Sequence, residues 1–264
     1  MRYVTCDVFT TDPFTGNPLA VVLDADGLRG EQMQRIAAEF GYSETVFVGD
    51  PTEPGFDARL RIFTPRTELA FAGHPIVGTS LILAEGDRRL VFQVPVGPVV
   101  VEVRNSAARV AAPAAFEVLD SVDAAAVAAA VGIDATAVLG QPVVASCGTP
   151  FLVAETTVLD RARPGELDGV GATGLLLYAR TEAALRARVF APALGIPEDP
   201  ATGSAALVLA GLLAQDSGPG SWLVQQGEHV GRPSQLHVGG DAAGATWVEG
   251  SAVVMMRGDL VALP

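Results

Sequence analysis

Positive charge is scarce in this sequence. Its 264 residues include 17 Lys and Arg against 30 Asp and Glu, which gives a formal net charge of −13 at pH 7. Proteins that bind nucleic acid need clustered Lys and Arg to neutralise the phosphates. The shortage of cationic side chains therefore argues against a nucleic-acid partner, and solubility is the simpler explanation of the acidity.

Cysteine and the sequence patterns of metal sites are also nearly absent. Cys6 and Cys147 lie far apart and neither belongs to a C-x-x-C pair, so nothing indicates a disulfide framework or a zinc knuckle. His74, His229 and His237 have no second His or Cys within one helical turn, and H-E-x-x-H does not occur. We therefore expect no metal ion and no cofactor.

Long unbroken hydrophobic runs are the third absence. Residues 135–154 carry no charge over about 20 residues, the length of a membrane span, but two Gly and two Pro residues divide the run into strand, turn and strand. Near the N-terminus, Asp7 stands where a secretory signal needs an apolar segment. We expect a soluble, cytoplasmic protein that has no membrane partner.

Short apolar segments separated by turn residues make up most of the chain, and 49% of the residues are hydrophobic. Many strands with few helices between them indicate an α+β fold with antiparallel or mixed sheets, not a doubly wound parallel sheet. Helices are expected over residues 28–40, ending at Gly41, and over 123–131, with Asp120 or Ser121 as the cap. Strands are expected at residues 4–9, 20–23, 45–48, 59–63, 89–94, 99–104, 143–146, 151–154, 175–178, 188–190, 222–225, 235–238 and 252–257.

Two further helices, at residues 72–84 and 199–213, are apolar on every side. Such a helix must be buried on all its faces. We infer two similar halves, each a β-barrel-like mixed sheet wrapped around one central helix, with residues 104–116 as the linker. The second of these helices is expected to start with Asp199 as N-cap and Pro200 as its first residue.

Polar side chains stand at the junctions of these elements. Glu44 comes where a helix gives way to an apolar strand, and partial burial there would raise the pKa of its carboxyl toward the range useful for proton transfer. His74 and Ser204 lie near the starts of the apolar helices, and Asp199 precedes the second. Simpler roles stay open for each: a solvated turn acid, a satisfied buried histidine, a first-turn serine and a helix cap.

Taken together, these residues suggest one site. If the helix starts at Gly73 and Gly203 face each other, their backbone N–H groups and positive dipole ends would bind a small carboxylate in the cleft between the halves. Glu44, His74 and Asp199 around that carboxylate would supply proton donors and acceptors without metal or cofactor. The arrangement suits moving a proton at a carbon atom next to an acid or an enamine.

At these residues the sequence resembles the PhzF family, a group of isomerases of phenazine biosynthesis within the diaminopimelate-epimerase-like fold. The most specific strings are FAGHP at residues 71–75 and GIPEDPATGSA at 195–205. Between residues 104 and 188 the resemblance rests on pattern alone. The other matching strings are DVFT at 7–10, GNPLAVV at 16–22, GYSETVF at 41–47, RIFTP at 61–65, FAP at 190–192, QG at 226–227 and GRPS at 231–234.

The resemblance implies two pseudo-symmetric halves, residues 1–114 and 115–249, with a C-terminal strand from about 250–264 completing the first. It implies a homodimer and a cofactor-free isomerisation of trans-2,3-dihydro-3-hydroxyanthranilate. Glu44 would relay a proton between carbons, and His74 and Asp199 would assist catalysis. Substrate binding would fall to Gly73, Gly203, Ser204 and Asn17.

Three alternatives are weighed against this interpretation. Amino-acid epimerases of the same fold use two opposed cysteines, but the corresponding positions are assigned here to Ala72 and Ala201, which cannot carry a proton. A hydrolytic triad of Ser204, His74 and Asp199 lacks the G-x-S-x-G elbow. A relative with another substrate, or one that binds a small acid without turnover, stays open.

Overall fold

Most of the regular secondary structure is β-strand, arranged around two apolar helices. The computed structural model describes residues 1–164 and 170–264. Two compact units can be distinguished, unit 1 (Met1–Ala111 with Glu249–Pro264) and unit 2 (Ala112–Val248). Mixed sheets with few helices confirm the predicted α+β fold.

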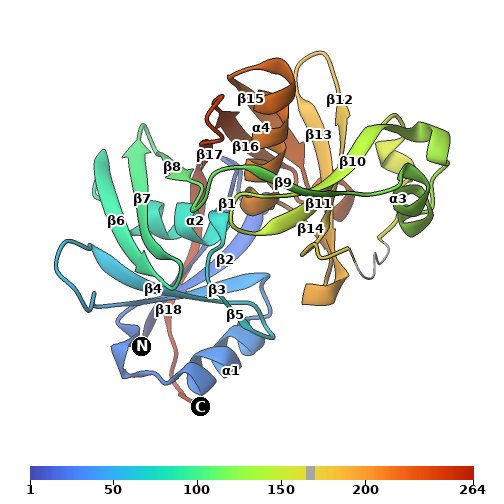
Figure 1. Cartoon of the computed structure of the whole chain (residues 1–264). Coiled ribbons are helices and arrows are strands. Elements are labelled where there is room, and N and C mark those ends of the chain that lie inside the picture. The colour runs from blue at the N-terminus through green and yellow to red at the C-terminus, as the bar shows by residue number, and fades with distance from the viewer. Residues whose placement is uncertain (165–169) are drawn as a thin grey trace. The chain divides into compact units, whose positions relative to one another are not determined.

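In unit 1 a mixed sheet surrounds helix α2, and helix α1 lies on the outside (Figure 1). The helices are α1 (Gly30–Phe40) and α2 (Gly73–Leu83), with a short 3-10 helix η1 (Ala25–Gly27). The strands are β1 (Arg2–Val8), β2 (Asn17–Val22), β3 (Glu44–Gly49), β4 (Ala58–Phe63), β5 (Glu68–Leu69), β6 (Arg88–Val94), β7 (Gly97–Arg104), β8 (Ala107–Ala111) and β18 (Ala252–Asp259). The order of paired strands is β18–β1–β2–β3–β4–β6–β7–β8, and only β2–β3 and β4–β6 are parallel.

The sequence of α2 explains why the sheet encloses it. The helix has no charged residue, and it is buried without interruption from Gly73 to Ser80. At Gly78 an added Cβ would collide with the side chains of Leu19 and Val8, so the missing side chain lets α2 lie close against β2 and β1. The opposite face of the sheet packs on the apolar side of α1.

Unit 2 repeats this arrangement. Its helices are α3 (Ala124–Val131) and α4 (Gly203–Ser217), with 3-10 helices η2 (Ala135–Ala137), η3 (Leu159–Arg161), η4 (Pro192–Leu194) and η5 (Glu228–Val230). The strands are β9 (Glu117–Ser121), β10 (Val138–Ser146), β11 (Pro150–Thr156), β12 (Leu175–Arg180), β13 (Leu185–Ala191), β14 (Ile196–Asp199), β15 (Gly220–Gln226), β16 (Ser234–Gly240) and β17 (Thr246–Gly250), which crosses the unit boundary. The paired order β9–β10–β11–β12–β13–β15–β16 reproduces β18–β1–β2–β3–β4–β6–β7, including the two parallel pairs.

The repeat extends to an ion pair that precedes each apolar helix. In unit 1, Arg61 pairs with Glu68 and lies over the ring of Phe63. In unit 2, Arg188 pairs with Glu198 and lies over the ring of Phe190. Each glutamate stands five residues before the glycine that begins the helix. The two pairs differ in burial: the side chains are 30% and 33% exposed in unit 1 but 6% and 7% in unit 2.

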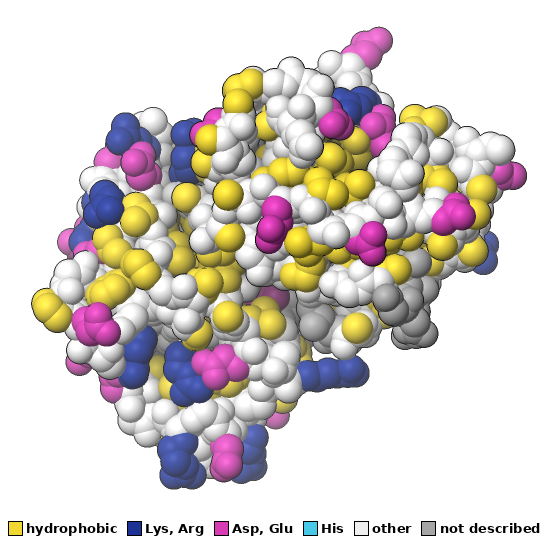
Figure 2. All heavy atoms as spheres, in the orientation of Figure 1, with side chains coloured by type: hydrophobic (Ala, Val, Ile, Leu, Met, Phe, Trp, Pro, Cys, Tyr) yellow, Lys and Arg dark blue, Asp and Glu magenta, His cyan; other side chains and the backbone are white. Residues whose placement is uncertain are grey.

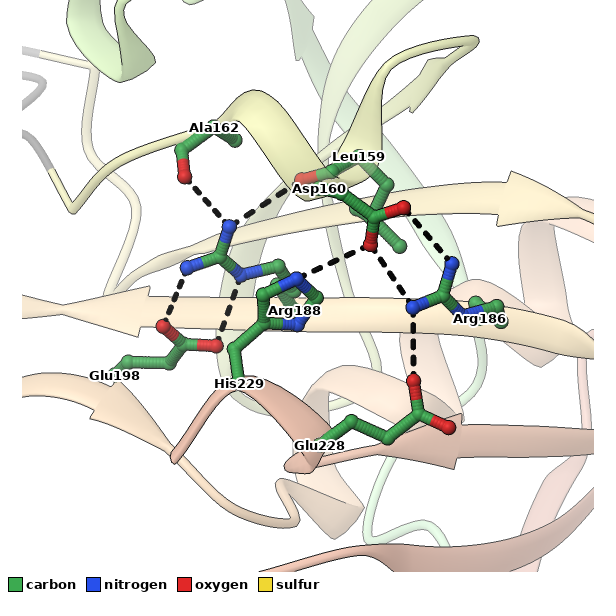
Figure 3. Close-up of polar contacts among 8 residues, drawn as sticks. All are labelled: Leu159, Asp160, Ala162, Arg186, Arg188, Glu198, Glu228 and His229. Atoms are coloured by element: carbon green, nitrogen blue, oxygen red, sulfur yellow. Dashed lines mark hydrogen bonds and ion pairs between the residues drawn. The ribbon is translucent and has the colours of Figure 1, made fainter. Parts of the chain in front are cut away.

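Figure 3 shows the hydrogen bonds of the buried pair. Arg188 donates Nε and Nη2 to the two carboxylate oxygens of Glu198 and Nη1 to the carbonyls of Leu159 and Ala162. Beside it, Asp160 accepts from Arg186 and lies 3.1 Å from His229 Nε2, while Arg186 also donates to Glu228. These contacts join η3, β13, β14 and η5 within unit 2.

Two local predictions are wrong. Residues 104–116 were expected to be a linker, but they contain β8, in which Ala108 and Val110 point into the core of unit 1. The cap of α3 is neither Asp120 nor Ser121, which belong to β9, but Asp123, whose Oδ1 accepts from Ala125 N–H.

Charged side chains are mixed rather than separated on the face drawn in Figure 2. Nine arginines form ion pairs with Asp or Glu. Cys6 and Cys147 are buried free thiols. Within the described residues, none of the helices has the length and apolar character that a membrane span requires.

The two equivalent ion pairs provide a matched stability test. Glu198→Ala would leave the Arg188 guanidinium buried without its counter-ion, which costs about 3–5 kcal/mol of unfolding free energy. Glu68→Ala removes the exposed counterpart and should cost about 1 kcal/mol or less. Urea unfolding of both variants against the wild type measures the difference, and equal losses would contradict it.

Candidate active site

Glu44 is the first residue of β3 and lies on the side of the sheet that faces α2. Its parallel register partner is Leu19, whose side chain contacts α2 at Gly78. The strand follows directly after α1, because Gly41 ends that helix in a left-handed conformation with φ of 66°. Glu44 is 9% exposed, so a carboxyl group stands largely out of water beside the apolar helix.

His74 is the partner of Glu44. It is the second residue of α2, it is 3% exposed, and its Nε2 lies 3.4 Å from Glu44 Oε2. Burial lowers the pKa of His74 to about 3, because the surrounding apolar side chains cannot solvate an imidazolium. The contact is therefore one between a carboxyl group and a neutral imidazole, not a salt bridge.

Asn17 belongs to the same region of unit 1. It begins β2, is fully buried, and its Oδ1 accepts a hydrogen bond of 2.8 Å from Ser43 Oγ. Ser43 directly precedes Glu44, so this hydrogen bond joins the starts of β2 and β3. The structure thus brings Asn17, Glu44 and His74 to one end of the α2 core.

In unit 2, Asp199 is not the helix cap that its Asp-Pro sequence suggests. It ends β14 and pairs with Val189 of β13, while α4 begins only at Gly203 with Thr202 as N-cap. The strand pairing keeps Asp199 extended and outside the helix. Capping therefore does not explain this aspartate, which is 6% exposed.

Two neighbours hold Asp199 in place. The Thr202 hydroxyl donates to Asp199 Oδ2 over 2.6 Å. Gln226, at the end of β15, donates Nε2 to the Asp199 carbonyl over 2.7 Å and accepts the Thr202 N–H at Oε1 over 3.2 Å. Thr202 and Gln226, like Ser43, were not predicted as site residues. The only sign of them in the sequence is that they lie in the strings that carry the family resemblance.

The two apolar helices begin alike. Gly73 and Gly203 are their first residues, both buried, and His74 and Ser204 are the second. The residues directly before them are Ala72 and Thr202, neither of which caps its helix with its side chain. Thr202, not Ala201, is thus the counterpart of Ala72, and the conclusion that no thiol occupies these positions is unchanged. The first turns carry the positive dipole end of each helix.

In the part of the chain that the structure describes, no three His, Cys, Asp or Glu side chains are grouped as a metal site would need.

The predicted site residues fall into two sets, one in each unit. Asn17, Glu44, Gly73 and His74 belong to unit 1, and Asp199, Gly203 and Ser204 to unit 2.

Comparison with known proteins identifies the family of the chain. The sequence model of the PhzC-PhzF family, described as phenazine biosynthesis-like protein, matches residues 6–258. The trans-2,3-dihydro-3-hydroxyanthranilate isomerase of Pseudomonas aeruginosa is 35% identical over 276 residues, covering 97% of this chain and 98% of that protein. An uncharacterised isomerase of Mesorhizobium japonicum is 36% identical over 300 residues, covering 98% of each. A solved structure, a predicted epimerase from Pseudomonas aeruginosa, is 30% identical with a TM-score of 0.88 and covers 99% of both chains.

The buried His74 predicts a pH dependence of stability. An unfolded His74 takes up a proton near pH 6.5, whereas the folded protein takes it up only near pH 3. Below pH 6.5 protonation therefore favours the unfolded chain, and the unfolding free energy falls by about 1.4 kcal/mol for each pH unit from this group. Above pH 6.5 the contribution is fully retained.

Urea unfolding at several values between pH 7.5 and 4.5 measures this slope. His74→Gln should show a flatter fall than the wild type. His237→Gln, the same change at an exposed strand position, retains His74 and therefore its slope. A His74→Gln variant with the wild-type slope would show that the buried imidazole is charged.

Proposed function

The chain belongs to the PhzC-PhzF family of phenazine biosynthesis-like proteins and is an isomerase, and from this premise we propose that Glu44 moves a proton between carbon atoms of a small carboxylated ring. The observation that carries the proposal is the buried contact of Glu44 with the neutral ring of His74, 3.4 Å apart. A general acid or base must take up and release a proton without being held in one form.

The neutral state of His74 matters for that requirement. An imidazolium ion at this distance would stabilise the carboxylate form of Glu44 and make it a weaker base. A neutral ring can orient the carboxyl group without adding that charge. Glu44 would then accept a C–H proton, the bonding electrons would shift through the conjugated substrate, and the protonated carboxyl would return the proton to another carbon. The formula of the substrate is unchanged, as an isomerisation requires.

The internal repeat supports a single proton carrier. Thr45 pairs with Phe63 in unit 1 as Leu175 pairs with Phe190 in unit 2, so the counterpart of Glu44 is Gly174. A side chain there would collide with the Phe190 carbonyl. Of these two equivalent positions, only that of Glu44 carries an acid.

Thiol chemistry is disfavoured by the cysteines themselves. Burial raises the pKa of Cys6 to about 12, and it also raises the pKa of Cys147, so neither supplies a thiolate at neutral pH. A hydrolytic triad is disfavoured as well, because it needs His74 as the base for Ser204, and the contact seen for His74 is with Glu44.

For the substrate we propose trans-2,3-dihydro-3-hydroxyanthranilate or a close analogue, in keeping with the name of the Pseudomonas aeruginosa relative. Backbone N–H groups at Gly73 and Gly203 would bind its carboxylate with the help of the helix dipoles. Asn17, Ser204 and Asp199 are proposed to bind the other polar groups of the same molecule, and His74 assists the proton transfer at Glu44.

The test is turnover of this compound in D₂O, followed by NMR. The wild type should form product and incorporate deuterium at carbon. Glu44→Gln keeps the shape of the side chain but cannot accept the proton, so we expect a loss of about 10²–10⁴-fold or more. Glu39→Gln is the matched control, because Glu39 is an exposed acid on α1 of the same unit, and it should keep wild-type activity.

Near-normal turnover in Glu44→Gln would overturn the assignment of the proton carrier. No turnover of the compound by the wild type, with NMR still showing that it binds, would indicate a different substrate or a relative that binds small acids without turnover.

A further inference from the structure

Thr202, Gln226 and Asp199 form a line of hydrogen bonds in unit 2. The Thr202 hydroxyl is 2.6 Å from Asp199 Oδ2, and Gln226 Nε2 is 3.1 Å from the Thr202 hydroxyl. Asp199 is 6% exposed and Gln226 is 2% exposed. Neither Thr202 nor Gln226 has a part in the chemistry proposed above. Both nevertheless donate hydrogen bonds to Asp199, the one acid among the predicted site residues of unit 2.

The direction of each hydrogen bond follows from counting protons. The amide nitrogen of Gln226 has two protons and uses them on the Asp199 carbonyl and the Thr202 hydroxyl. The Thr202 hydroxyl has one proton, and since it receives one from Gln226, it donates its own to Asp199 Oδ2. Asp199 is therefore an acceptor in this contact, as an ionised carboxylate is.

Thr202 does not serve the structural purpose that its position suggests. It is the N-cap of α4, where a threonine hydroxyl normally accepts a backbone N–H of the first turn and stabilises the helix by about 1 kcal/mol. No such hydrogen bond is formed from its side chain. The hydroxyl points to Asp199 instead, so stabilising the helix is not the reason for this threonine.

The backbone next to these hydrogen bonds is also closely packed. Gln226 Oε1 accepts the Thr202 N–H over 3.2 Å. The next residue, Gly227, has φ of 83°, and a Cβ there would collide with the carbonyls of Pro200 and Arg232. The end of β15 thus packs directly on the segment between Asp199 and Thr202.

We propose that Thr202 and Gln226 are positioning residues, which fix the Asp199 carboxylate as the acceptor for a polar N–H or O–H group of the substrate. The inference rests on the proposed function, because it treats Asp199 as a substrate contact. The amide of Gln226 is essential to this arrangement. A carboxylate at this position could not donate a hydrogen bond to Thr202, and it would be repelled by the negative charge of Asp199.

A double-mutant cycle tests whether Thr202 acts through Asp199. Thr202→Val keeps the shape but removes the hydroxyl, and kcat/KM should fall about tenfold to a hundredfold, the worth of a hydrogen bond to a charged group. Thr202→Ser restores the hydroxyl and should restore activity. Thr202→Val combined with Asp199→Asn should be no worse than Asp199→Asn alone. Fully additive losses, or no rescue by Thr202→Ser, would overturn the inference.

Gln226→Glu tests the amide. It removes both donated hydrogen bonds and adds a negative charge, so kcat/KM should fall at least as far as in Thr202→Val. Gln235→Glu makes the same change at an exposed position of β16 and should leave activity unchanged. Circular dichroism shows which variants are folded. A folded Gln226→Glu variant with wild-type activity would overturn the inference.

One measurement is independent of any substrate. In protein carrying ¹³C-labelled Asp, assigned with Asp199→Asn, the midpoint of the Asp199 carboxyl titration should lie about one pH unit higher in Thr202→Val than in the wild type. The charged groups on the elements around it, Arg188, Glu198, Glu228 and His229, are the same in both proteins. An unchanged midpoint would overturn the inference. A raised midpoint in a protein without isomerase activity would support it and overturn the proposed function.

Discussion

A helix without a polar face can exist in water only if it is enclosed, and α2 and α4 impose this condition on the chain. Each helix needs a sheet that curves around it. In both units the strands of that sheet pair in the same order. Once strands cover the sides of such a helix, its ends are where unsatisfied backbone groups meet polar side chains. The candidate site residues lie at such places, at the first residues of β2, β3, α2 and α4 and at the last residue of β14.

The enclosed helices and several of the candidate site residues could be predicted from local sequence. The long apolar runs predict the two enclosed helices, Gly41 marks the end of α1, and Glu44, His74, Asp199 and Ser204 are polar residues at element junctions. Other features depend on contacts between distant residues. Asp199 followed by Pro200 has the pattern of a helix start, but pairing with Val189 on β13 keeps it extended and moves the cap to Thr202. Strand β9 has five exposed residues and hence no burial pattern to recognise. The hydrogen bonds made by Ser43 and Gln226 likewise join separate strands. The homodimer and the exact substrate remain predictions.

The repeat makes the differences between the units informative. Equivalent positions hold Glu44 and Gly174, Leu69 and Asp199, and His74 and Ser204. The side chains at these equivalent positions have diverged, and of the positions of Glu44 and Gly174 only the first carries an acid. Transfer by one carboxyl group fits that asymmetry better than exchange between two.

The two units also differ in the burial of their equivalent ion pairs. The ion pair before α2 is partly exposed, whereas its counterpart before α4 is buried, and all three guanidinium nitrogens of Arg188 donate hydrogen bonds. Such a pair adds little net stability but penalises any displacement, because one charge would be left alone in an apolar environment. Glu198 precedes Asp199, so the strand that carries the acceptor is held from one side by Arg188 and from the other by Gln226. Unit 1 instead keeps the Glu44 carboxyl 3.4 Å from the uncharged imidazole of His74. This difference is the basis for proposing Asp199 as a fixed acceptor and Glu44 as the acid that changes its protonation state.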